Sequence, residues 1–403
     1  MYDSPGSSGL SCCMVVAAMK LESVEIRNFR NHPGTTLSFA EGINAIFGDN
    51  GEGKTNIVEA ISYLCLTKSF YASSDTLAMR IGTQGFDVCG NFRADNDTGW
   101  RVTASYEGSI AKKTIMVNKT PVETLSSVVG QFPAVILSPE QNGITFGAPA
   151  ERRKFLDMAI AQASKLYLDE VLEYRKILRQ RNKILLDARL ARKDCTQALE
   201  PWDESLVRTG SSIMVRRARF IEDFRPLVSE HFSFVAGGTE QPGVHYVPSF
   251  DLSFSSSREI IEEQFSKELQ SHSDEERRTG TTTVGPHRDE LEFFIDDLSL
   301  RKFASQGQHK TFLVALKLAE FFYLKEQRNE TPMLLLDDVF SELDDHRSRR
   351  LLDLAGRMGQ VFITATDDRA FAAAEFPWND GHRRFLVHKG TVTDNAQAKL
   401  FVN

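Results

Sequence analysis

The spacing of apolar residues predicts an amino-terminal region rich in strands. Positions 21–26 alternate between apolar and polar residues, as expected for a half-buried strand, and 36–39 predicts a second strand. The short apolar run 43–47 ends at Gly48 and is typical of a buried strand, and the helical spacing of 55–66 follows it. Further strands are expected at 86–93, 100–107 and 113–117.

The pattern changes near Ala150. From Glu151 to about residue 224 the spacing is helical. A heptad-like apolar stripe extends over only about two turns of the repeat, which predicts a short helical hairpin rather than a long coiled coil; its members are Val171, Tyr174, Leu178 and Leu185. Region 231–252 is punctuated by glycine and proline and has a strand-like pattern, and 258–278 predicts a charged amphipathic helix.

Strands and one long helix alternate in the last third of the chain. Strands are predicted at 290–295, 333–336 and 361–364, and a helix at 308–327. At the other end, residues 1–18 are rich in serine and glycine near the start and have no basic segment before their short apolar run. We therefore interpret 1–18 as a disordered extension and expect ordered structure to begin near Met19.

Composition narrows the class of protein. A chain of 403 residues corresponds to two or three domains at about 150 residues each. No apolar run approaches the roughly 18 residues that span a bilayer, which indicates a soluble protein without a membrane segment. Five cysteines lack the spacing of a disulfide framework or a metal site, and a reducing cytoplasm fits them best. The net charge of −7 excludes a uniformly basic coat for nucleic acid.

One motif carries specific chemistry. The eight residues that match G-x-x-x-x-G-K-[ST] are Gly48, Asp49, Asn50, Gly51, Glu52, Gly53, Lys54 and Thr55. Glycines allow the backbone to fold around phosphates, the lysine reaches the β- and γ-phosphates, and the threonine hydroxyl is a ligand for Mg²⁺. A chance glycine-rich turn is the simpler interpretation, but the predicted strand before it and helix after it favour nucleotide binding.

An acidic strand end complements this motif. The apolar run 333–336 is followed by Asp337 and Asp338. In phosphoryl transfer one carboxylate holds Mg²⁺ and a second orients the attacking water, so Asp337 suits the metal and Asp338 the catalytic role. A strand capped by solvated acids is the alternative, and the signal is weak without the glycine-rich loop.

A second half-site is predicted before the helix at 308–327. The simplest role of Ser305 is to cap that helix. Ser305, Gly307 and Gln308 also match the S-x-G-Q signature of ABC-type ATPases, in which the serine binds the γ-phosphate held by a partner subunit. Residues 341–344 resemble the D-loop of the same ATPases.

The spacing of these motifs separates subfamilies. Lys54 and Ser305 are 251 positions apart, which is far more than a transporter ATPase domain uses, and the insertion between them is helical. Within the SMC-like branch the chain closely resembles the RecF family of bacterial recombination mediators over about 19–367. The stretches that carry the resemblance are 21–31, the glycine-rich loop, 138–140, 152–157, 285–289 and 305–310.

The resemblance implies an α/β head of ABC type, split in sequence into 19–145 and 282–403, with a mainly helical arm inserted at 146–281. It implies ATP and Mg²⁺ as cofactors, nucleotide contacts by Arg30 and the signature residues, an ATP-dependent homodimer and slow hydrolysis. It also implies sequence-independent binding to gapped DNA or single-strand/double-strand junctions, RecR- and RecO-type mediators as partners, and roles in replication-fork repair and the SOS response.

Three positions depart from the common ABC pattern. Asp338 stands where most ABC proteins have glutamate, and its shorter side chain fits slow turnover. Thr366 occupies the place of the switch histidine of transporters, and a threonine has no imidazole proton to donate. Gln141 is the nearest candidate for the glutamine of the Q-loop.

The charge pattern provides a hypothesis for DNA. Residues 151–220 hold 16 Lys plus Arg against 10 Asp plus Glu, a local excess of +6. Such a patch neutralises phosphates without reading bases, although a solvated face paired with its own acids is equally compatible. The excess is carried by Arg152, Arg153, Lys154, Arg175, Lys176, Arg179, Arg181, Lys183, Arg216, Arg217 and Arg219.

Three functions remain in competition. The first is a DNA-bound ATPase switch of RecF type. The second is the ATPase subunit of a transporter, against which the motif spacing argues. The third is a nucleotide-gated scaffold that never hydrolyses ATP and uses it only to hold a dimer together.

Overall fold

The computed structural model describes residues 17–252 and 257–394. Strand β1 (Ala17–Phe29) begins two residues before the expected start at Met19, because Ala17 and Ala18 pair in parallel with β12 (Glu330–Thr331). The rest of the expected extension, residues 1–16, lies outside the described residues.

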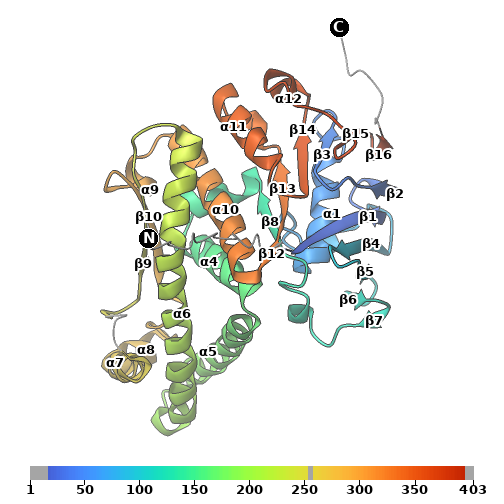
Figure 1. The fold of residues 1–403 in the computed structure, drawn as a ribbon. Helices are drawn as coiled ribbons and strands as arrows, with labels where there is room; N and C mark the ends of the chain where they lie inside the picture. Colours follow the sequence, from blue (N-terminus) through green and yellow to red (C-terminus); the bar gives the residue numbers. More distant parts are fainter. Residues whose placement is uncertain (1–16, 253–256, 395–403) are drawn as a thin grey trace, which may run out of the picture.

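The described chain contains three β-sheets (Figure 1). The largest is mainly antiparallel and contains β1, β2 (His32–Ser38), β4 (Gly85–Ala94), β5 (Gly99–Glu107), β6 (Lys112–Val117), β7 (Thr120–Pro121) and β12. The second is mainly parallel, in the order β16 (Thr391–Asp394), β15 (Arg383–His388), β3 (Ile43–Phe47), β14 (Val361–Ala365), β13 (Met333–Asp337) and β8 (Ala134–Leu137). The third consists of β11 (Leu298–Ser299), β10 (Glu290–Ile295) and β9 (Pro242–Val247).

Helices surround and extend these sheets. Those of the first third are α1 (Lys54–Leu66), α2 (Asp75–Ala78), α3 (Gly143–Phe146) and the 3₁₀ turns η1 (Leu125–Ser127) and η2 (Pro139–Asn142). The middle of the chain forms α4 (Pro149–Ala163), α5 (Lys165–Ala191), α6 (Thr196–Ala236), α7 (Arg258–Ser271) and α8 (Ser273–Thr279). The last part forms α9 (Leu300–Phe303), α10 (Gln306–Arg328), η3 (Val339–Glu342), α11 (Asp345–Ala355) and α12 (Arg369–Ala373).

The parallel sheet separates two hydrophobic cores. On β13, Met333 and Leu335 pack in the core that contains α1 and the antiparallel sheet, whereas Leu334 and Leu336 pack in the core that contains α4, α6 and α10. Because both faces are covered, its strands are continuous apolar runs rather than alternating ones. The runs predicted at 43–47, 333–336 and 361–364 are confirmed as buried parallel strands.

The parallel register brings distant segments to one edge of the sheet. Asp337 on β13 is paired with Thr364 on β14, and Ala365 on β14 is paired with Phe47 on β3. The segments that follow these strands therefore begin side by side, although they are almost 300 positions apart in sequence. Ligands of open α/β sheets bind at this carboxyl edge.

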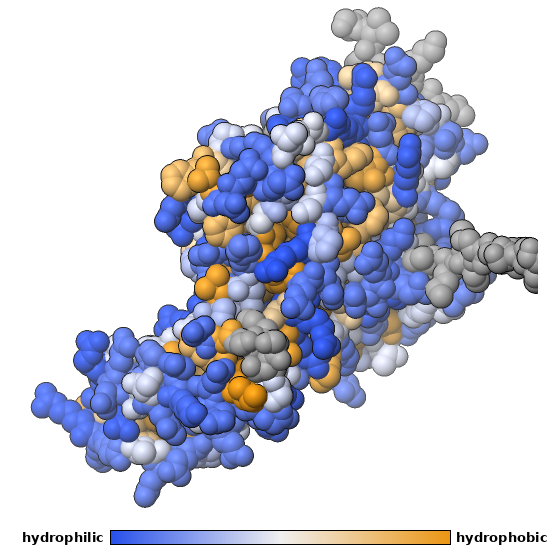
Figure 2. Space-filling view, turned by 60° about the vertical axis from the view of Figure 1, so that its left-hand side comes forward, coloured by the Kyte–Doolittle hydropathy of each residue, from blue (hydrophilic) through white to orange (hydrophobic). Residues whose placement is uncertain are grey.

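A helical hairpin projects from the sheets. Helices α5 and α6 pack against each other, with α7 and α8 beside their far end (Figure 1). The predicted apolar stripe forms part of their seam, because Val171, Tyr174 and Leu185 are buried and Leu178 is partly buried. In the space-filling view this arm is a narrower lobe with a mainly hydrophilic surface (Figure 2).

Three details of this region differ from the sequence prediction. Helix α6 continues through Pro201 and Pro226 to Ala236, so the first part of 231–252 is helical and only Pro242–Val247 forms a strand. Burial of Phe232 and Val235 keeps the chain helical there, and Gly237 ends the helix with a left-handed φ of 68°. The helix expected at 258–278 is divided into α7 and α8 at His272.

The division into head and arm remains a proposal. Strand β9 lies within the range expected for the arm, and it pairs along its full length with β10 in the range expected for the head. The second half of α6 packs on α10, a helix of the head. The two parts therefore share one core rather than meeting at a simple boundary.

A buried arginine holds this junction together. The Arg217 side chain, which is 3% exposed, donates to Asp157 Oδ1 at 2.8 Å, to the Pro286 carbonyl at 2.6 Å and to Asp289 Oδ2 at 3.2 Å. Two stretches that resemble the RecF family, 152–157 and 285–289, therefore meet through one side chain. Their role in this fold is to join α4, α6 and the segment that leads into β10.

We expect Arg217→Ala to destabilise the protein strongly. The change leaves the buried carboxylate of Asp289 without its counter-charge and leaves Asp157 paired only with the exposed Arg175. Breaking a buried ion pair in this way costs about 3–5 kcal/mol. Arg219→Ala is the control, because Arg219 lies two residues further along the same helix and is exposed. Urea unfolding of both variants measures the difference, and an equal loss of stability would contradict the role assigned to Arg217.

Candidate nucleotide site

The glycine-rich loop connects β3 to α1 in the conformation that the motif requires. Gly48, Gly51 and Gly53 have φ angles of 151°, 85° and 112°, which side chains with a Cβ rarely adopt. A Cβ at Gly53 would also lie 2.4 Å from Asn31 Oδ1, whereas one at Gly51 would meet open space. The loop is thus packed on one side and open on the other, and it leads directly into the amino end of α1.

Two turns from other strands support the loop from behind. Asn31, in the β1–β2 turn, donates to the Glu52 carbonyl at 2.8 Å, and the Gly390 amide, in the β15–β16 turn, donates to the same oxygen at 3.0 Å. His32 Nε2 donates to the Gly53 carbonyl at 3.0 Å. The Glu52 carboxylate accepts from the Lys389 amide, so this side chain is directed toward the β15–β16 turn.

Lys54 lies folded against the loop. Its ammonium donates to the carbonyls of Gly48 at 2.7 Å and of Asp49 at 3.0 Å. Burial lowers the pKa of Lys54, while the neighbouring carboxylates of Asp338 and Asp337 oppose that shift. A buried cation that is held only by carbonyl oxygens is well placed to exchange them for phosphate oxygens.

A short hydrogen-bonded chain joins the loop to the acidic strand end. The Thr55 hydroxyl donates to Asp337 Oδ1 at 2.8 Å, and the Thr364 hydroxyl donates to the same oxygen at 2.8 Å. Thr364 in turn accepts from the Asp338 amide at 2.9 Å. Burial raises the pKa of Asp337, and the two hydroxyl groups counteract the rise.

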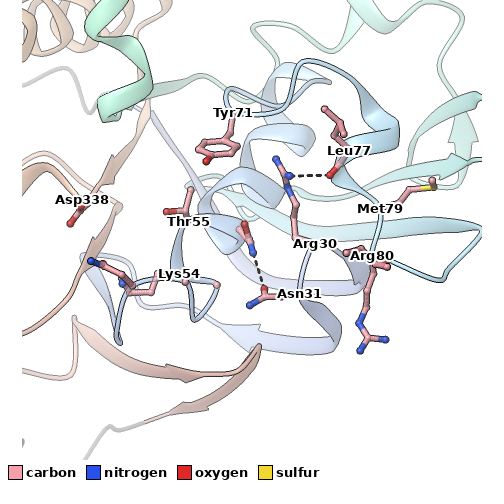
Figure 3. Close-up of a pocket in the computed structure, with 14 residues that line it drawn as sticks. Arg30, Asn31, Lys54, Thr55, Tyr71, Leu77, Met79, Arg80 and Asp338 are labelled. Atoms are coloured by element: carbon pink, nitrogen blue, oxygen red, sulfur yellow. Dashed lines mark hydrogen bonds between the residues drawn. The ribbon is translucent and has the colours of Figure 1, made fainter.

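A cavity of about 680 Å³ opens over the loop (Figure 3). Lys54, Thr55 and Asp338 lie at one end of it, which we call the phosphate end. The opposite end, which we call the base end, combines apolar and basic side chains; its lining residues are Arg30, Tyr71, Leu77, Met79, Arg80 and Ile81. The size and the mixed lining are those of a site for a small ligand with one charged and one apolar end.

The structure brings many of the predicted site residues to this cavity, including five of the glycine-rich loop. Those that line it are Arg30, Asn50, Gly51, Gly53, Lys54, Thr55 and Asp338. Gly48, Asp49 and Glu52 shape the loop without lining the cavity, and Asp337 contributes through its bond to Thr55. Asp338 has a left-handed φ of 50°, which is uncommon for a residue with a Cβ and marks the position as special.

The signature residues lie elsewhere on the chain. Ser305, Gly307 and Gln308 are absent from the lining of the cavity. Figure 1 shows α9, which leads into the signature helix α10, on the opposite side of the view from α1. Ser305 Oγ accepts from the Gln308 amide at 3.2 Å and Gln308 Oε1 accepts from the Ser305 amide at 2.8 Å, so the simpler capping role is confirmed. Because Ser305 remains exposed, that role leaves it available to a partner.

Two other candidates can be placed. Thr366 directly follows β14 at the edge of the sheet that bears the glycine-rich loop. Gln141 lies in η2 after β8 and lines a different cavity, between α1, α4 and α10, so the structure does not bring it into the nucleotide cavity.

The base end was not predicted from the sequence, apart from Arg30, which was predicted to contact the nucleotide and does line the cavity. The Arg30 guanidinium donates to Glu59 of α1 at 2.9 and 3.0 Å and lies 5.2 Å from the centre of the Tyr71 ring. Tyr71 and Ile81 are exposed apolar residues in the loops on either side of the short helix α2, and Leu77 is exposed on α2 itself. Exposed apolar side chains in this stretch were the available signal, but only the fold shows that they converge.

The structure corrects the expected DNA patch. Arg152, Arg181 and Arg217 are buried, and their charges are bound to Glu290 at 2.8 Å, Glu276 at 2.7 Å and Asp157 at 2.8 Å, respectively. Arg216 is also paired, with Glu170 at 3.0 Å. Arg152, Arg181 and Arg217 are therefore not available to DNA, because they are buried and already paired, whereas Arg216 keeps 36% of its side chain exposed.

The fold and the motifs together define an ATPase head of ABC type with a helical arm inserted in its sequence. The RecF/RecN/SMC N terminal domain family matches residues 20–379. The DNA replication and repair protein RecF of Chloroherpeton thalassium is 42% identical over 357 residues, which is 88% of this chain and 96% of that protein. The protein of the same name from Salinibacter ruber is 38% identical over 378 residues, 92% of this chain and 91% of its own. The chain belongs to the RecF family.

Solved structures agree with this assignment. The recombination mediator protein RecF "in RecFOR pathway", solved with ATP or with "ATPrS", superimposes with a TM-score of 0.85 in both cases, at 30% and 31% identity and over 94% of this chain. An Smc head domain from Pyrococcus furiosus with an extended coiled coil shares the fold alone, at a TM-score of 0.53 and 16% identity. Among the described residues, no helix is both long enough and apolar enough to cross a bilayer.

We expect Thr364→Val to shift the pH dependence of Mg²⁺-supported ATP binding to higher pH. In the unchanged protein the Thr364 hydroxyl lowers the pKa of Asp337, so its removal raises that pKa. The Asp337 carboxylate then stays protonated up to a higher pH, and protons compete with Mg²⁺ for it up to that pH. Thr364→Ser keeps the hydroxyl and is the control. Titrations of a fluorescent ATP analogue at a series of pH values measure the midpoints, and identical midpoints for Thr364→Val and Thr364→Ser would rule out this contribution.

Proposed function

We propose that this chain is an ATP-dependent DNA-binding switch that dimerises when it holds ATP and hydrolyses the nucleotide slowly. The observation that carries the proposal is the contact between Thr55 and Asp337 at 2.8 Å. It joins the glycine-rich loop to the acidic strand end at one cavity, in a chain whose relatives are named DNA replication and repair proteins.

ATP and Mg²⁺ are the proposed cofactors. Lys54 supplies the counter-charge for the β- and γ-phosphates, and the base end accepts the adenine ring against Tyr71 and Leu77. Thr55 and Asp337 provide a hydroxyl and a carboxylate oxygen, the ligand types that Mg²⁺ prefers alongside phosphates and water. When bound, the metal neutralises charge that develops on the phosphates.

Asp338 is the proposed catalytic residue. It lines the phosphate end, and its backbone is held in place by Thr364. A carboxylate there orients the attacking water, and an aspartate reaches less far than a glutamate, which supports slow turnover. The alternative is a scaffold that binds ATP and never hydrolyses it. Membership of the RecF family argues against the remaining candidate, the ATPase subunit of a transporter.

The proposed dimer follows from the position of the signature residues. Ser305, Gly307 and Gln308 are outside the cavity that contains Lys54. In an ABC arrangement they reach the γ-phosphate held by a second copy, and two-fold symmetry creates two such sites. ATP then bridges the copies, whereas ADP lacks the bridging phosphate.

DNA is the proposed target, at gapped sites or single-strand/double-strand junctions and without sequence preference. The family assignment and the exposed cations of the arm support this part of the proposal. The solved relatives are described within a RecFOR pathway, which supports RecR- and RecO-type mediators as partners. Recombination mediation, replication-fork repair and the SOS response in the cytoplasm are the roles we assign by analogy.

Binding and hydrolysis should separate in two variants. Lys54→Ala should abolish ATP affinity, because the phosphate charge loses its main counter-charge. Asp338→Asn should retain ATP and Mg²⁺ but slow turnover, because an amide is a poorer acceptor for the water proton. Equilibrium ATP binding and single-turnover hydrolysis distinguish these effects, and unchanged turnover in Asp338→Asn would favour the scaffold alternative.

Ser305→Arg should abolish ATP-dependent dimerisation and hydrolysis together while ATP binding to the monomer persists. The bulky cation replaces the hydroxyl at the surface that faces the partner's nucleotide. Ser257→Arg is the control, because Ser257 is an exposed serine at the start of α7. Sedimentation with a slowly hydrolysed ATP analogue is the measurement, and a wild-type dimer in Ser305→Arg would reduce Ser305 to a helix cap.

A further inference from the structure

A second cavity, of about 390 Å³, lies where α1, α4 and α10 approach one another. Four lysines line it, but two of them are neutralised: Lys113 pairs with Asp75 at 2.9 Å and Lys317 with Glu320 at 2.8 Å. Lys154 and Lys68 differ from these. The nearest acid to Lys154 is Glu151 at 3.8 Å, and the side chains of Lys154 and Glu151 are both largely exposed.

Lys68 forms no salt bridge among the residues that the structure describes. Acids do line the same cavity, but Asp75 pairs with Lys113, Glu320 with Lys317, and Glu151 lies 3.8 Å from Lys154. Desolvation and the charges of Lys154, Arg175 and Lys113 lower the pKa of Lys68. Lys68 is therefore close to other cations and has no salt bridge of its own. Such a cluster is stabilised when an external anion approaches.

The same charge continues along α5. Arg175, Arg179 and Lys183 are exposed and four residues apart, so they share one side of the helix at a rise of about 6 Å for each step. Arg175 is paired with Asp157 at 3.2 Å but keeps 57% of its side chain exposed. Arg179 donates only to a backbone carbonyl, and in the described residues Lys183 has no acidic partner.

We name these five residues the basic track: Lys68, Lys154, Arg175, Arg179 and Lys183. It leads from the head to the arm. Three exposed lysines of the arm outside the track have acids within 4 Å: Lys165 pairs with Asp169, Lys176 with Glu173 and Lys267 with Glu263. Within the track, Lys68, Arg179 and Lys183 have no salt bridge to a described residue, so their charges are not balanced as on an ordinary solvated helix face.

The loop 67–74 connects the head end of the track to the nucleotide cavity. Ser69 Oγ donates to Glu59, the buried acid that holds Arg30, and accepts from the Tyr71 amide at 2.8 Å. Arg30 and Tyr71 line the nucleotide cavity, whereas Lys68 and Ser69 line the second cavity. One short loop is therefore a wall of both cavities, and the hydrogen bonds of Glu59 and Ser69 connect the two sides.

We propose that the sugar–phosphate backbone of duplex DNA lies along the basic track, and that the loop 67–74 makes the position of Lys68 depend on the nucleotide. The inference rests on the proposed function, which it extends by naming the surface and its link to ATP. Cations spaced along a line neutralise phosphates without reading bases, which fits binding that ignores sequence.

The test measures binding of duplex DNA by fluorescence anisotropy at a series of salt concentrations, with a slowly hydrolysed ATP analogue and with ADP. The track variant combines Lys68→Gln, Lys154→Gln and Lys183→Gln. The control combines Lys165→Gln, Lys176→Gln and Lys267→Gln, which removes the same charge from exposed lysines outside the track. ATP affinity and thermal stability of both proteins show that the fold and the nucleotide site are intact.

The track variant should bind DNA more weakly and lose about 0.9 from the salt slope for each phosphate contact removed, roughly 3 in all. The control should keep most of the slope. Ser69→Ala should bind ATP but show a smaller difference in DNA affinity between the ATP analogue and ADP.

Equal slopes in the track variant and the control would overturn the track. An unchanged ATP-to-ADP ratio in Ser69→Ala would overturn the link through the loop. If the unchanged protein bound no DNA with either nucleotide, the proposed function itself would fail. That outcome is distinct from a failure of the track alone and from a failure of the link through the loop.

Discussion

The parallel pairing of β3, β14 and β13 is the constraint on which the rest of the structure depends. It places the loop after Phe47, the acids after Leu336 and the hydroxyl of Thr364 at one edge of a sheet whose two faces are both buried. The bonds that converge on Asp337 follow from that register. A shift of one residue in β13 would turn Asp337 to the other face and separate it from Thr55.

The same sheet connects the nucleotide site to the helical arm through packed elements. One of its faces packs on α10, the helix that begins with the signature, and α10 packs on α6 of the arm. Arg217 joins α6 to α4 through Asp157 and to the segment leading into β10 through Asp289. Head and arm are therefore coupled by a shared core and a buried charge network, rather than by a flexible linker.

Local features of the chain were predictable from sequence, whereas long-range ones were not. The strand, loop and helix around Gly48 and Lys54 were predicted because a phosphate loop imposes its residues within a short span. The base end of the cavity was not, because Tyr71 and Ile81 become neighbours of Arg30 only through β1 and α1.

The extent of α6 was underestimated because burial of Phe232 and Val235 outweighs the prolines. The basic patch was overestimated because the acids Glu290 and Asp289, which pair with Arg152 and Arg217, lie more than 70 positions away in sequence.

The central claim is that each nucleotide site is shared between two chains, and mixing two inactive variants tests it most directly. In a mixed dimer of Lys54→Ala and Ser305→Arg, one site combines the intact Lys54 of one chain with the intact Ser305 of the other, while the second site carries both changes. The measurement is ATP hydrolysis of the 1:1 mixture compared with each variant alone. We expect the mixture to hydrolyse ATP, at part of the rate of the unchanged protein, although each variant alone does not. A mixture as inactive as its components would contradict it.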